Sequence, residues 1–322
     1  MNISRLFDQF EDTKVLVLGD VMIDAYFYGS VSRISPEAPV PIVNLTKKEQ
    51  RLGGAANVAL NLKSLGAVPI ICSIKGNDAD GQRLKELCKE NGLVVDGLIN
   101  DYKRETTVKT RIIGNSHQLL RIDEEDTADI DESVEDLVYE AVNSFIDEVD
   151  VLIFQDYNKG LLTAGLIQRV IALCTRKKVP MVVDPKFNNF YEYKGVTLFK
   201  PNKKEIQQAE NITEKLNLRD IKVLANTVRQ KLNADKIMTT LSEDGVIIIN
   251  KTETIHLPAH ARKIVDVSGA GDSVLSVAAL CVAAGIGDEI IAALSNLAGG
   301  IVCEQIGVVP IDKDLLLGEA ME

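Results

Sequence analysis

Short apolar segments alternate with longer segments of helical periodicity after residue 130, and this alternation restricts the fold more than any other feature of the sequence. The apolar runs have the length of buried strands and occupy residues 151–154, 181–184, 197–200 and 236–240. The helical segments around them cover residues 132–148, 163–178, 203–209 and 218–232. Strands and helices in alternation form a mostly parallel sheet with helices on both faces. The sequence therefore predicts an α/β fold of this kind.

The first half of the chain shows the same alternation, with one interruption. Strand-like runs at 15–20 and 68–74 flank a helical segment at 53–66, and a further helix is expected at 81–92. Between the first strand and the first helix, residues 22–50 are rich in β-branched and aromatic residues and in prolines. We expect short strands and turns there, outside the main core.

Residues 103–122 form a second segment outside the α/β pattern. They are predicted to form a hairpin around Gly114-Asn115. We expect this hairpin to pair with the strands of 22–50 in a small β-sheet lid, since enzymes that exclude water close over their substrates. A hairpin at 245–258 and helices near 270–284 and 287–304 complete the pattern. Because no repeat or linker interrupts it, we expect residues 1–322 to form a single domain.

The composition excludes several classes of protein. The net charge of −11 argues against nucleic-acid partners, because a phosphate backbone attracts basic surfaces. The five cysteines are scattered among apolar residues without metal-ligand spacing, as is typical of buried thiols in a reducing compartment. The N-terminal segment lacks the apolar core of a signal peptide, and no apolar run approaches the roughly 20 residues of a membrane span. We therefore expect a cytoplasmic protein without membrane partners.

The segment DVSGAGDSV at 266–274 is the strongest candidate for a reactive site. Gly269, Ala270 and Gly271 begin an apolar helix, so backbone N–H groups and the helix dipole can hold an anion there. Asp272 beside them has the chemistry of a general base, which takes a proton from a hydroxyl while the N–H groups hold a transferring phosphoryl group. The motif alone is equally compatible with an aspartate that caps an ordinary helix.

Two further segments provide candidates for binding a nucleotide and its metal. In KPNKKE, Asn202 and Glu205 stand three residues apart at a helix start and could orient the water shell of Mg²⁺. Taken alone, this pair is better explained as helix capping. In TTLSEDG, Thr240, Ser242 and Gly245 form a turn suited to phosphate oxygens. Taken alone, that segment is better explained as a plain hairpin turn.

The end of the first strand leads to candidates for sugar recognition. Asp20 and Asp24 supply acceptors for hydroxyl groups. Gly53 and Gly54 permit a close backbone approach, and Asn57 supplies an amide. The alternative is a Gly-Gly turn before an alanine-rich helix. Because there is no GxxxxGK[ST] loop, and no GxGxxG after the first strand, P-loop kinases and dinucleotide-binding enzymes are disfavoured.

In this order, GGAANVALNLKSLG, PNKKE and DVSGAGD resemble the motifs of the PfkB-type, ribokinase-like carbohydrate kinases over essentially the whole chain. The resemblance implies a mostly parallel sheet flanked by helices, a β-sheet lid over the sugar, and ATP and Mg²⁺ as cofactors. It implies that Asp272 is the base, that residues 269–271 form the anion hole, and that Asn202 and Glu205 serve the metal, through water.

The same resemblance implies further roles. Thr240 and Gly245 would bind the nucleotide phosphates, with Ser242 standing where many members have Gly. Asn296 would line the adenine pocket. A monovalent-cation site near Asp266 and a homodimer through the lid strands are also expected from the resemblance.

A narrower resemblance is carried by VLVLGDVMIDAYFYGSVSRISPEAPVPIV, NSHQLLRID, DYNKG and DPK. These segments are similar to those of bacterial heptose-7-phosphate kinases of lipopolysaccharide precursor synthesis. The resemblance implies phosphorylation of D-glycero-D-manno-heptose 7-phosphate at O1, giving the 1,7-bisphosphate. Many such kinases are fused to a C-terminal nucleotidyltransferase. Its HxGH-type motif is missing here, so we expect no such domain within this sequence.

A sugar phosphate needs basic groups in its pocket. Arg33 lies in the first lid segment, Lys109 and Arg111 share one face of a lid strand, and Lys186 follows the strand that ends at 184. Lys and Arg on lid strands also discourage edge pairing, which is the alternative for Lys109 and Arg111.

Two other functions stay open at this point. The first is a kinase for a different sugar, such as fructose 6-phosphate or ribose, with the same fold and the same base. The second is a regulator that binds sugar or nucleotide without catalysis. The presence of Asp272, Asn202 and Glu205 disfavours the regulator, since regulators often lose the base or the metal motif.

Overall fold

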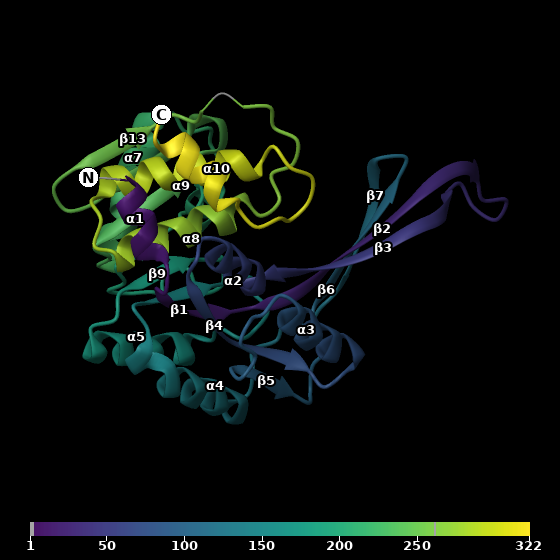
Figure 1. Cartoon of the computed structure of the whole chain (residues 1–322), viewed down its shortest axis with the longest axis horizontal. Coiled ribbons are helices and arrows are strands. Elements are labelled where there is room, and N and C mark those ends of the chain that lie inside the picture. Colours follow the sequence, from purple (N-terminus) through teal and green to yellow (C-terminus); the bar gives the residue numbers. More distant parts are fainter. Residues whose placement is uncertain (1–2, 261) are drawn as a thin grey trace.

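The core of the protein is a large, mostly parallel sheet. Within the described residues, 3–260 and 262–322 of the computed structural model, nine strands form it in the order β13-β12-β11-β10-β9-β8-β1-β4-β5 (Figure 1). β12 and β13 run antiparallel to their neighbours, and the other pairs are parallel. The strands are β1 (Lys14–Gly19), β4 (Val68–Gly76), β5 (Leu98–Asp101), β8 (Val151–Gln155), β9 (Met181–Asp184), β10 (Leu198–Phe199), β11 (Lys236–Thr240), β12 (Val246–Ile249) and β13 (Thr254–Leu257).

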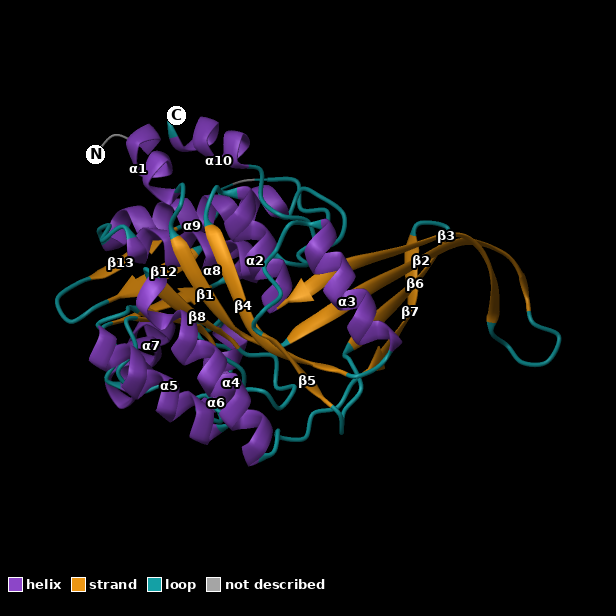
Figure 2. Ribbon diagram, turned by 60° about the horizontal axis from the view of Figure 1, so that its bottom comes forward, coloured by secondary structure: helices purple, strands orange, loops and turns teal. Residues whose placement is uncertain are grey.

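Helices cover both faces of this sheet, as the alternating sequence predicts. One face carries α1 (Ile3–Phe10), α2 (Ala55–Ser64), α3 (Ala79–Glu90), α8 (Ala270–Ala283), α9 (Asp288–Val302) and α10 (Lys313–Ala320). The other face carries α4 (Glu132–Phe145), α5 (Ala164–Lys177), α6 (Lys203–Ala209) and α7 (Leu218–Leu232) (Figure 2). None of the described helices is long and apolar enough to cross a membrane.

Alternation within single strands divides the buried side chains between two cores. In β1, Val15 and Val17 pack with the α8 and α9 side, whereas Leu16 and Leu18 pack with the α4 and α5 side. Each strand residue therefore points to the opposite face from its neighbour, which a sheet buried on both faces requires. This explains why the strands are continuous apolar runs in the sequence.

A second, four-stranded sheet forms the lid, in the order β3-β2-β6-β7. Its strands are β2 (Val21–Ile34), β3 (Pro41–Gly54), β6 (Val108–Gly114) and β7 (His117–Glu124). The hairpin around Gly114-Asn115 and its pairing with the first lid segment are confirmed. Figure 1 shows the far ends of β2 and β3 extending well away from the α/β body.

The expectation of short strands in residues 22–50 is wrong, because β2 and β3 are each 14 residues long. Their register shifts between Tyr28 and Gly29 and again between Val31 and Arg33. Such irregularities break the two-residue alternation by which a long strand is read from a sequence. The helix expected at 53–66 also begins later, at Ala55, because Gly53 and Gly54 still pair within the lid sheet.

Candidate active site

The candidate site lies where the order of the central sheet reverses. β1 pairs with β4 on one side and with β8 on the other, so the chain continues from β1 in both directions of the sheet. Ligands of open α/β sheets bind beside the carboxyl ends of strands at such a switch point. Asp20 follows β1, Gln155 and Asp184 end β8 and β9, and the start of α8 packs against both of these strands.

Asp272, in the first turn of α8, is buried and held by three donors from distant parts of the chain. Asn57 Nδ2 donates to its Oδ2 at 2.6 Å. Gln155 Nε2 at 3.1 Å and the Tyr157 hydroxyl at 2.9 Å both donate to its Oδ1. The carboxylate is therefore oriented by α2 and by the segment after β8, which gives it one fixed position at the centre of the site.

The electrostatics of Asp272 suit a proton acceptor. Burial raises its pKa from 3.8 to about 6, and the nearby carboxylate of Asp184 acts in the same direction. The hydrogen bonds from Asn57 and Tyr157, and the charge of Lys200, oppose this rise. A base with a pKa just below neutral is ionised at physiological pH and still has appreciable affinity for a proton.

The start of α8 has the geometry of an anion site. Its N-cap Gly269 has φ of 81° and makes no side-chain capping hydrogen bond. A Cβ on Gly271 would lie 3.9 Å from both Asp184 Oδ2 and Lys200 Nζ, which are themselves 3.1 Å apart. The first N–H groups of a helix lack partners within it. These residues therefore fit a phosphate, with a lysine beside the exposed helix start.

Asn202 and Glu205 form a complete capping box at the start of α6. Asn202 Oδ1 accepts from the N–H of Glu205 at 2.9 Å, and Glu205 Oε2 accepts from the N–H of Asn202 at 2.8 Å. Glu205 Oε1 also accepts a hydrogen bond from Lys186 Nζ. No cluster of three or more acidic, His or Cys ligands occurs among the described residues. The pair fits a cation bound through water better than one bound directly.

The predicted nucleotide turn is a short 3₁₀ segment, Ser242–Asp244, after β11. Ser242 has φ of 55° and Gly245 has φ of 85°. A Cβ on Gly245 would lie 2.1 Å from the carbonyl oxygen of Leu257, so only glycine fits there. Thr240 pairs with Asn202 in an isolated β-bridge, which places this turn beside the start of α6. Asn296, in α9, donates to the carbonyl of Pro258 at 2.8 Å.

The candidates for sugar recognition gather at the base of the lid. Asp20 Oδ2 accepts from the N–H groups of Tyr157 at 2.8 Å and Lys159 at 3.2 Å. A Cβ on Gly53 would lie 2.2 Å from Asp24 Oδ2, and one on Gly54 would lie 2.3 Å from the carbonyl oxygen of Asp20. Both glycines are therefore required for the two aspartates to stand where they do.

Several buried polar atoms near Asp272 have no hydrogen-bond partner among the described residues. They are Asn57 Oδ1 and Gln155 Oε1, whose residues donate to Asp272, and Asp20 Oδ1, whose residue accepts from Tyr157. Buried polar atoms normally have a partner in the protein or in a ligand or water. Their concentration around one carboxylate indicates a site built for a molecule with many hydroxyl groups.

The four predicted phosphate-binding residues do not lie together. Arg111 pairs with Asp24, and Lys109 pairs with Asp123 at 3.1 Å and with Glu125 at 2.9 Å, all on the face of the lid that carries Asp24. Arg33 is exposed in the far half of β2, opposite Ile42. These three side chains remain candidates for the substrate's phosphate.

Lys186 lies elsewhere, beside the proposed base. Its Nζ contacts Glu205 and lies 5.5 Å from the centre of the Tyr157 ring. Burial lowers its pKa, but the carboxylates of Asp184, Glu205 and Asp272 outweigh that and raise the pKa well above its ordinary value. Lys186 is therefore a fixed positive charge among three acids.

Asp266, which is expected near a cation site, accepts hydrogen bonds from two different segments of the chain. Its Oδ1 accepts from the N–H of Ser268 and its Oδ2 from the N–H of Gly307, both at 2.9 Å. Burial raises its pKa, and these N–H groups together with the charge of Arg111 lower it below the ordinary value. Asp266 is therefore anionic at neutral pH, and the cation site stays a prediction.

Sequence reasoning missed four residues that the fold brings to Asp272. They are Gln155, Tyr157, Asp184 and Lys200, at the ends of three adjacent strands. Two of them lie in segments that carry the narrower resemblance, Tyr157 in DYNKG and Asp184 in DPK. Lys200 lies in KPNKKE, the candidate metal segment. These residues lie close together because β8, β9 and β10 are neighbours in the sheet, and this strand order cannot be read from the sequence.

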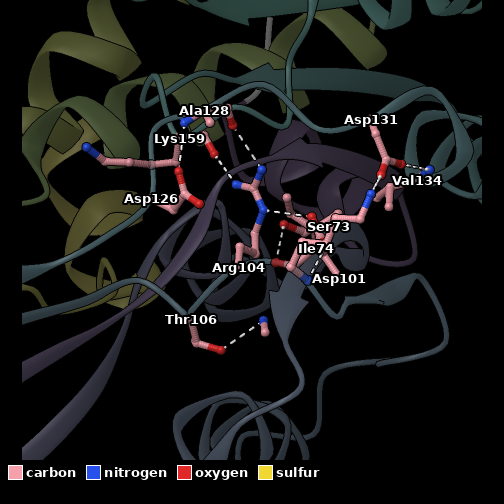
Figure 3. Close-up of polar contacts among 12 residues, drawn as sticks. Ser73, Ile74, Asp101, Arg104, Thr106, Asp126, Ala128, Asp131, Val134 and Lys159 are labelled. Atoms are coloured by element: carbon pink, nitrogen blue, oxygen red, sulfur yellow. Dashed lines mark hydrogen bonds and ion pairs between the residues drawn. The ribbon is translucent and has the colours of Figure 1, made fainter.

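Arg104, whose side chain is 7% exposed, was also missed. Its guanidinium donates to Asp101 Oδ2 at 2.9 Å, to the carbonyl of Lys159 at 2.7 Å and to the carbonyl of Ala128 at 2.9 Å (Figure 3). It thereby fixes the segment after β8 to the segment before the lid hairpin. Its role in this structure is to hold the loop that contacts both Asp20 and Asp272.

A comparison with protein families matches residues 12–314 to the family described as "pfkB family carbohydrate kinase". Among curated proteins, the chain is 39% identical over 316 residues to the bifunctional protein HldE of Syntrophotalea carbinolica. That match covers 98% of this chain and 64% of the relative. The chain spans 62% and 65% of HldE proteins from Desulfatibacillum aliphaticivorans and Geobacter sulfurreducens.

Solved structures share the fold. Phosphofructokinase-2 from Escherichia coli in complex with potassium superimposes with a TM-score of 0.79 at 17% identity, covering 97% of this chain and all of that one. Arabidopsis thaliana ribokinase complexed with ribose and ATP gives a TM-score of 0.72 at 15% identity, with 95% and 99% covered. At these identities the likeness concerns the fold alone.

Proposed function

Because the chain belongs to the pfkB family of carbohydrate kinases, we propose that it transfers the γ-phosphoryl group of ATP to O1 of D-glycero-D-manno-heptose 7-phosphate, giving the 1,7-bisphosphate used for ADP-heptose. The observation that carries the proposal is Asp272. It is a buried carboxylate with a raised pKa, held by three donors at the start of a helix that fits a phosphate.

The proton transfer follows from this geometry. The sugar lies between Asp272 and Asp20, where the unpartnered acceptors Asp20 Oδ1 and Gln155 Oε1 take its other hydroxyl groups. Asp272 accepts the proton of the reacting hydroxyl as its oxygen attacks the γ-phosphorus. The bond to the β,γ-bridging oxygen of ATP breaks, and ADP leaves with that electron pair.

Charge on the transferring group is stabilised by the chain's own donors. We assign the phosphoryl oxygens to the N–H groups of Gly269 and Gly271, because the N–H of Ala270, the third predicted anion-hole residue, already donates to the carbonyl of Val267 at 3.3 Å. Lys200 and Lys186 supply positive charge from the ends of β10 and β9. A bound Mg²⁺ would neutralise charge on the β- and γ-phosphates. Asn202 and Glu205 would hold it through water, and Thr240, Ser242, Gly245 and Asn296 would contact the nucleotide.

The phosphorylated end of the sugar is assigned to the lid. Asp24, Lys109 and Arg111 share the lid face that covers the site, and Arg33 follows further along the same sheet. A heptose phosphate extends further from its reacting carbon than a pentose does, and the basic side chains offer charge-assisted hydrogen bonds to its phosphate. Segments that resemble those of heptose-7-phosphate kinases, such as NSHQLLRID and DYNKG, support this sugar over fructose 6-phosphate or ribose. The 39% identity to an HldE protein extends over 98% of this chain.

A screen of ADP release tests the proposal. Heptose 7-phosphate, fructose 6-phosphate and ribose are compared at equal ATP, and the product is examined by NMR for a phosphate on C1. Heptose 7-phosphate is expected to give the highest kcat/KM. A higher value for another sugar would assign the same chemistry to that substrate. ATP binding without ADP release for any sugar would favour the non-catalytic regulator instead.

A further inference from the structure

The segment DYNKG, residues 156–160, joins the two parts of the site, and so far only the hydroxyl of Tyr157 has a part in the mechanism, as one donor to Asp272. It follows β8 directly. The N–H of Tyr157 donates to Asp20 Oδ2 at 2.8 Å, and the hydroxyl of the same residue donates to Asp272 Oδ1 at 2.9 Å. One residue therefore contacts both the sugar-side carboxylate and the base.

The hydrogen bonds on Asp272 are distributed unequally between its two oxygens. A carboxylate offers about four lone-pair positions, two on each oxygen. Oδ1 accepts from Gln155 and Tyr157, whereas Oδ2 accepts from Asn57 alone among the described residues. Oδ1 is thus saturated, and the one free position is on Oδ2.

We propose that Tyr157 is a positioning residue for phosphoryl transfer, which with Gln155 occupies Oδ1 of Asp272 so that Oδ2 is the oxygen that takes the substrate's proton. The inference rests on the proposed function, because it presumes that Asp272 is the base. It adds which atom of Asp272 reacts and which side chain decides this.

The surroundings of Tyr157 keep its hydroxyl in place. Lys186 Nζ lies 5.5 Å from the centre of the ring, and its positive charge is attracted to the ring face. Burial raises the pKa of the phenol well above 10, and the charges of Asp272 and Asp184 act in the same direction. The hydroxyl therefore stays protonated and remains a donor through the whole working range of pH.

The loop is held by three contacts, one to its backbone and two to its side chains. Arg104 donates to the carbonyl of Lys159, as Figure 3 shows. Lys159 Nζ pairs with Glu125 at 2.8 Å, and Tyr193 donates to Asp156 Oδ2 at 2.8 Å. A side chain on such a loop holds its partner within a narrow range of positions, as efficient proton transfer requires.

The hydroxyl of Tyr157 also affects the pH range in which Asp272 is ionised. Asp184, at the end of β9, favours the protonated form of Asp272. Lys200 after β10, together with the donors Asn57 and Tyr157, favours its ionised form. Lys186 after β9 is a further cation near it. Removal of the Tyr157 donor shifts the balance toward the protonated, inactive form.

The test is the variant Tyr157→Phe, which keeps the ring and removes the hydroxyl. The acidic limb of its kcat/KM profile is expected to move up by about one pH unit, since a hydrogen bond to a charged group is worth about 1.4 kcal/mol or more. At pH 6 the loss is about fivefold, and it approaches about tenfold toward pH 5, whereas above pH 8 the variant stays within a few-fold of the wild type. KM for ATP is expected to be unchanged.

Tyr193→Phe is the matched control, because it removes a buried phenol from the same region that contacts Asp156 and not Asp272. Its acidic limb is expected to stay where it is in the wild type. An unchanged limb in Tyr157→Phe, or a loss of equal size at every pH in both variants, would overturn the proposal.

A direct titration of Asp272 tests the role of Tyr157 independently of which sugar is the substrate. The carboxyl carbon of Asp272 is followed by ¹³C NMR between pH 4 and 8 in the wild type and in Tyr157→Phe, without any sugar. A higher apparent pKa in the variant supports the role of Tyr157 even if the ADP-release screen names another substrate. An identical titration in both proteins would refute it, whatever the kinetic result.

Discussion

At the scale of single residues, the site depends on the carboxylate of Asp272, whose buried environment disfavours its charged form. Asp272 is 5% exposed, and burial raises its pKa to about 6. Its three donors do not fully compensate for the lost water. Functional groups are often held at such a cost to stability, because their reactivity depends on the same environment.

Asp272→Asn is therefore expected to stabilise the fold at pH 8. A carboxyl group whose pKa is raised from 3.8 to about 6 by folding favours the folded state below pH 4, and this contribution is lost as the pH rises through 6. At pH 8 the variant should gain roughly 1–3 kcal/mol in the free energy of unfolding. The Asn57 amide can turn its unpartnered Oδ1 toward the new amide.

Urea unfolding at pH 8 and at pH 4.5 measures this effect. The advantage of the variant should shrink toward the lower pH, where the wild-type carboxyl group is protonated as well. An equal difference at both pH values, or a less stable variant at pH 8, would mean that the ionised carboxylate is not the source of the cost.

The sequence identified part of this site and missed the rest for a physical reason. Asp272, Gly269 and Gly271 stand in one short motif, so their proximity follows from the chain itself. Gln155 and Tyr157 lie more than a hundred residues away. Only the pairing of β8 with β1 and β9 brings them to the base.

At the scale of structural elements, the lid is a sheet with two different faces. The register places Asp24, Tyr26, Lys109 and Arg111 on one face. Tyr26 lies between the guanidinium groups of Arg51 and Arg111, at 5.1 and 5.3 Å from its ring centre. On this polar face Arg111 and Asp24 form an ion pair, with side chains 16% and 6% exposed, and the Tyr26 hydroxyl accepts from the N–H of Val308 at 3.4 Å.

Arg111→Ala is expected to destabilise the protein by about 3 kcal/mol, because it leaves a buried carboxylate without its cation. The side chain of Asp24 is only 6% exposed and has little access to water. The matched control is Arg121→Ala, since Arg121 pairs opposite Arg111 in the register but is half exposed. Exposed ion pairs contribute little to stability.

Thermal unfolding of the two variants distinguishes the two environments. A clear decrease in the midpoint temperature is expected for Arg111→Ala and almost none for Arg121→Ala. Equal effects would show that the polar face of the lid is not buried as the structure has it.

The element pattern was largely predictable in the α/β part and less so in the lid. Helices such as α5 have a periodic apolar face and an N-cap residue, here Thr163, and both features can be recognised in the sequence. In β2 only the first six residues are buried, and in β3 only the last three, so the rest of each strand has no buried apolar alternation to detect. Pairing between the two strands, rather than burial, holds their far halves in the sheet.

At the scale of the whole molecule, the protein is an α/β body with two cores and a lid that projects from it (Figure 1). The lid face opposite Asp24 carries apolar side chains, among them Leu120 and Ile122, which are 56% and 45% exposed. Exposed apolar patches of this kind mark interaction surfaces. The expected homodimer through the lid would cover them.

Sedimentation of the wild type is therefore expected to give about twice the chain mass of 35.2 kDa. Leu120→Glu should produce monomers, because a charge would be buried at the interface. Leu137→Glu is the control, since Leu137 is 54% exposed on α4, in the α/β body. A monomeric wild type, or a dimer that survives Leu120→Glu, would contradict the lid interface.

The most direct test of the central claim is the rate of ADP release by Asp272→Asn with ATP and heptose 7-phosphate. Loss of a general base lowers turnover by about 10²–10⁴-fold. We expect a loss of this size in Asp272→Asn, while calorimetry shows ATP binding unchanged. Turnover close to that of the wild type would contradict the assignment of Asp272 as the base.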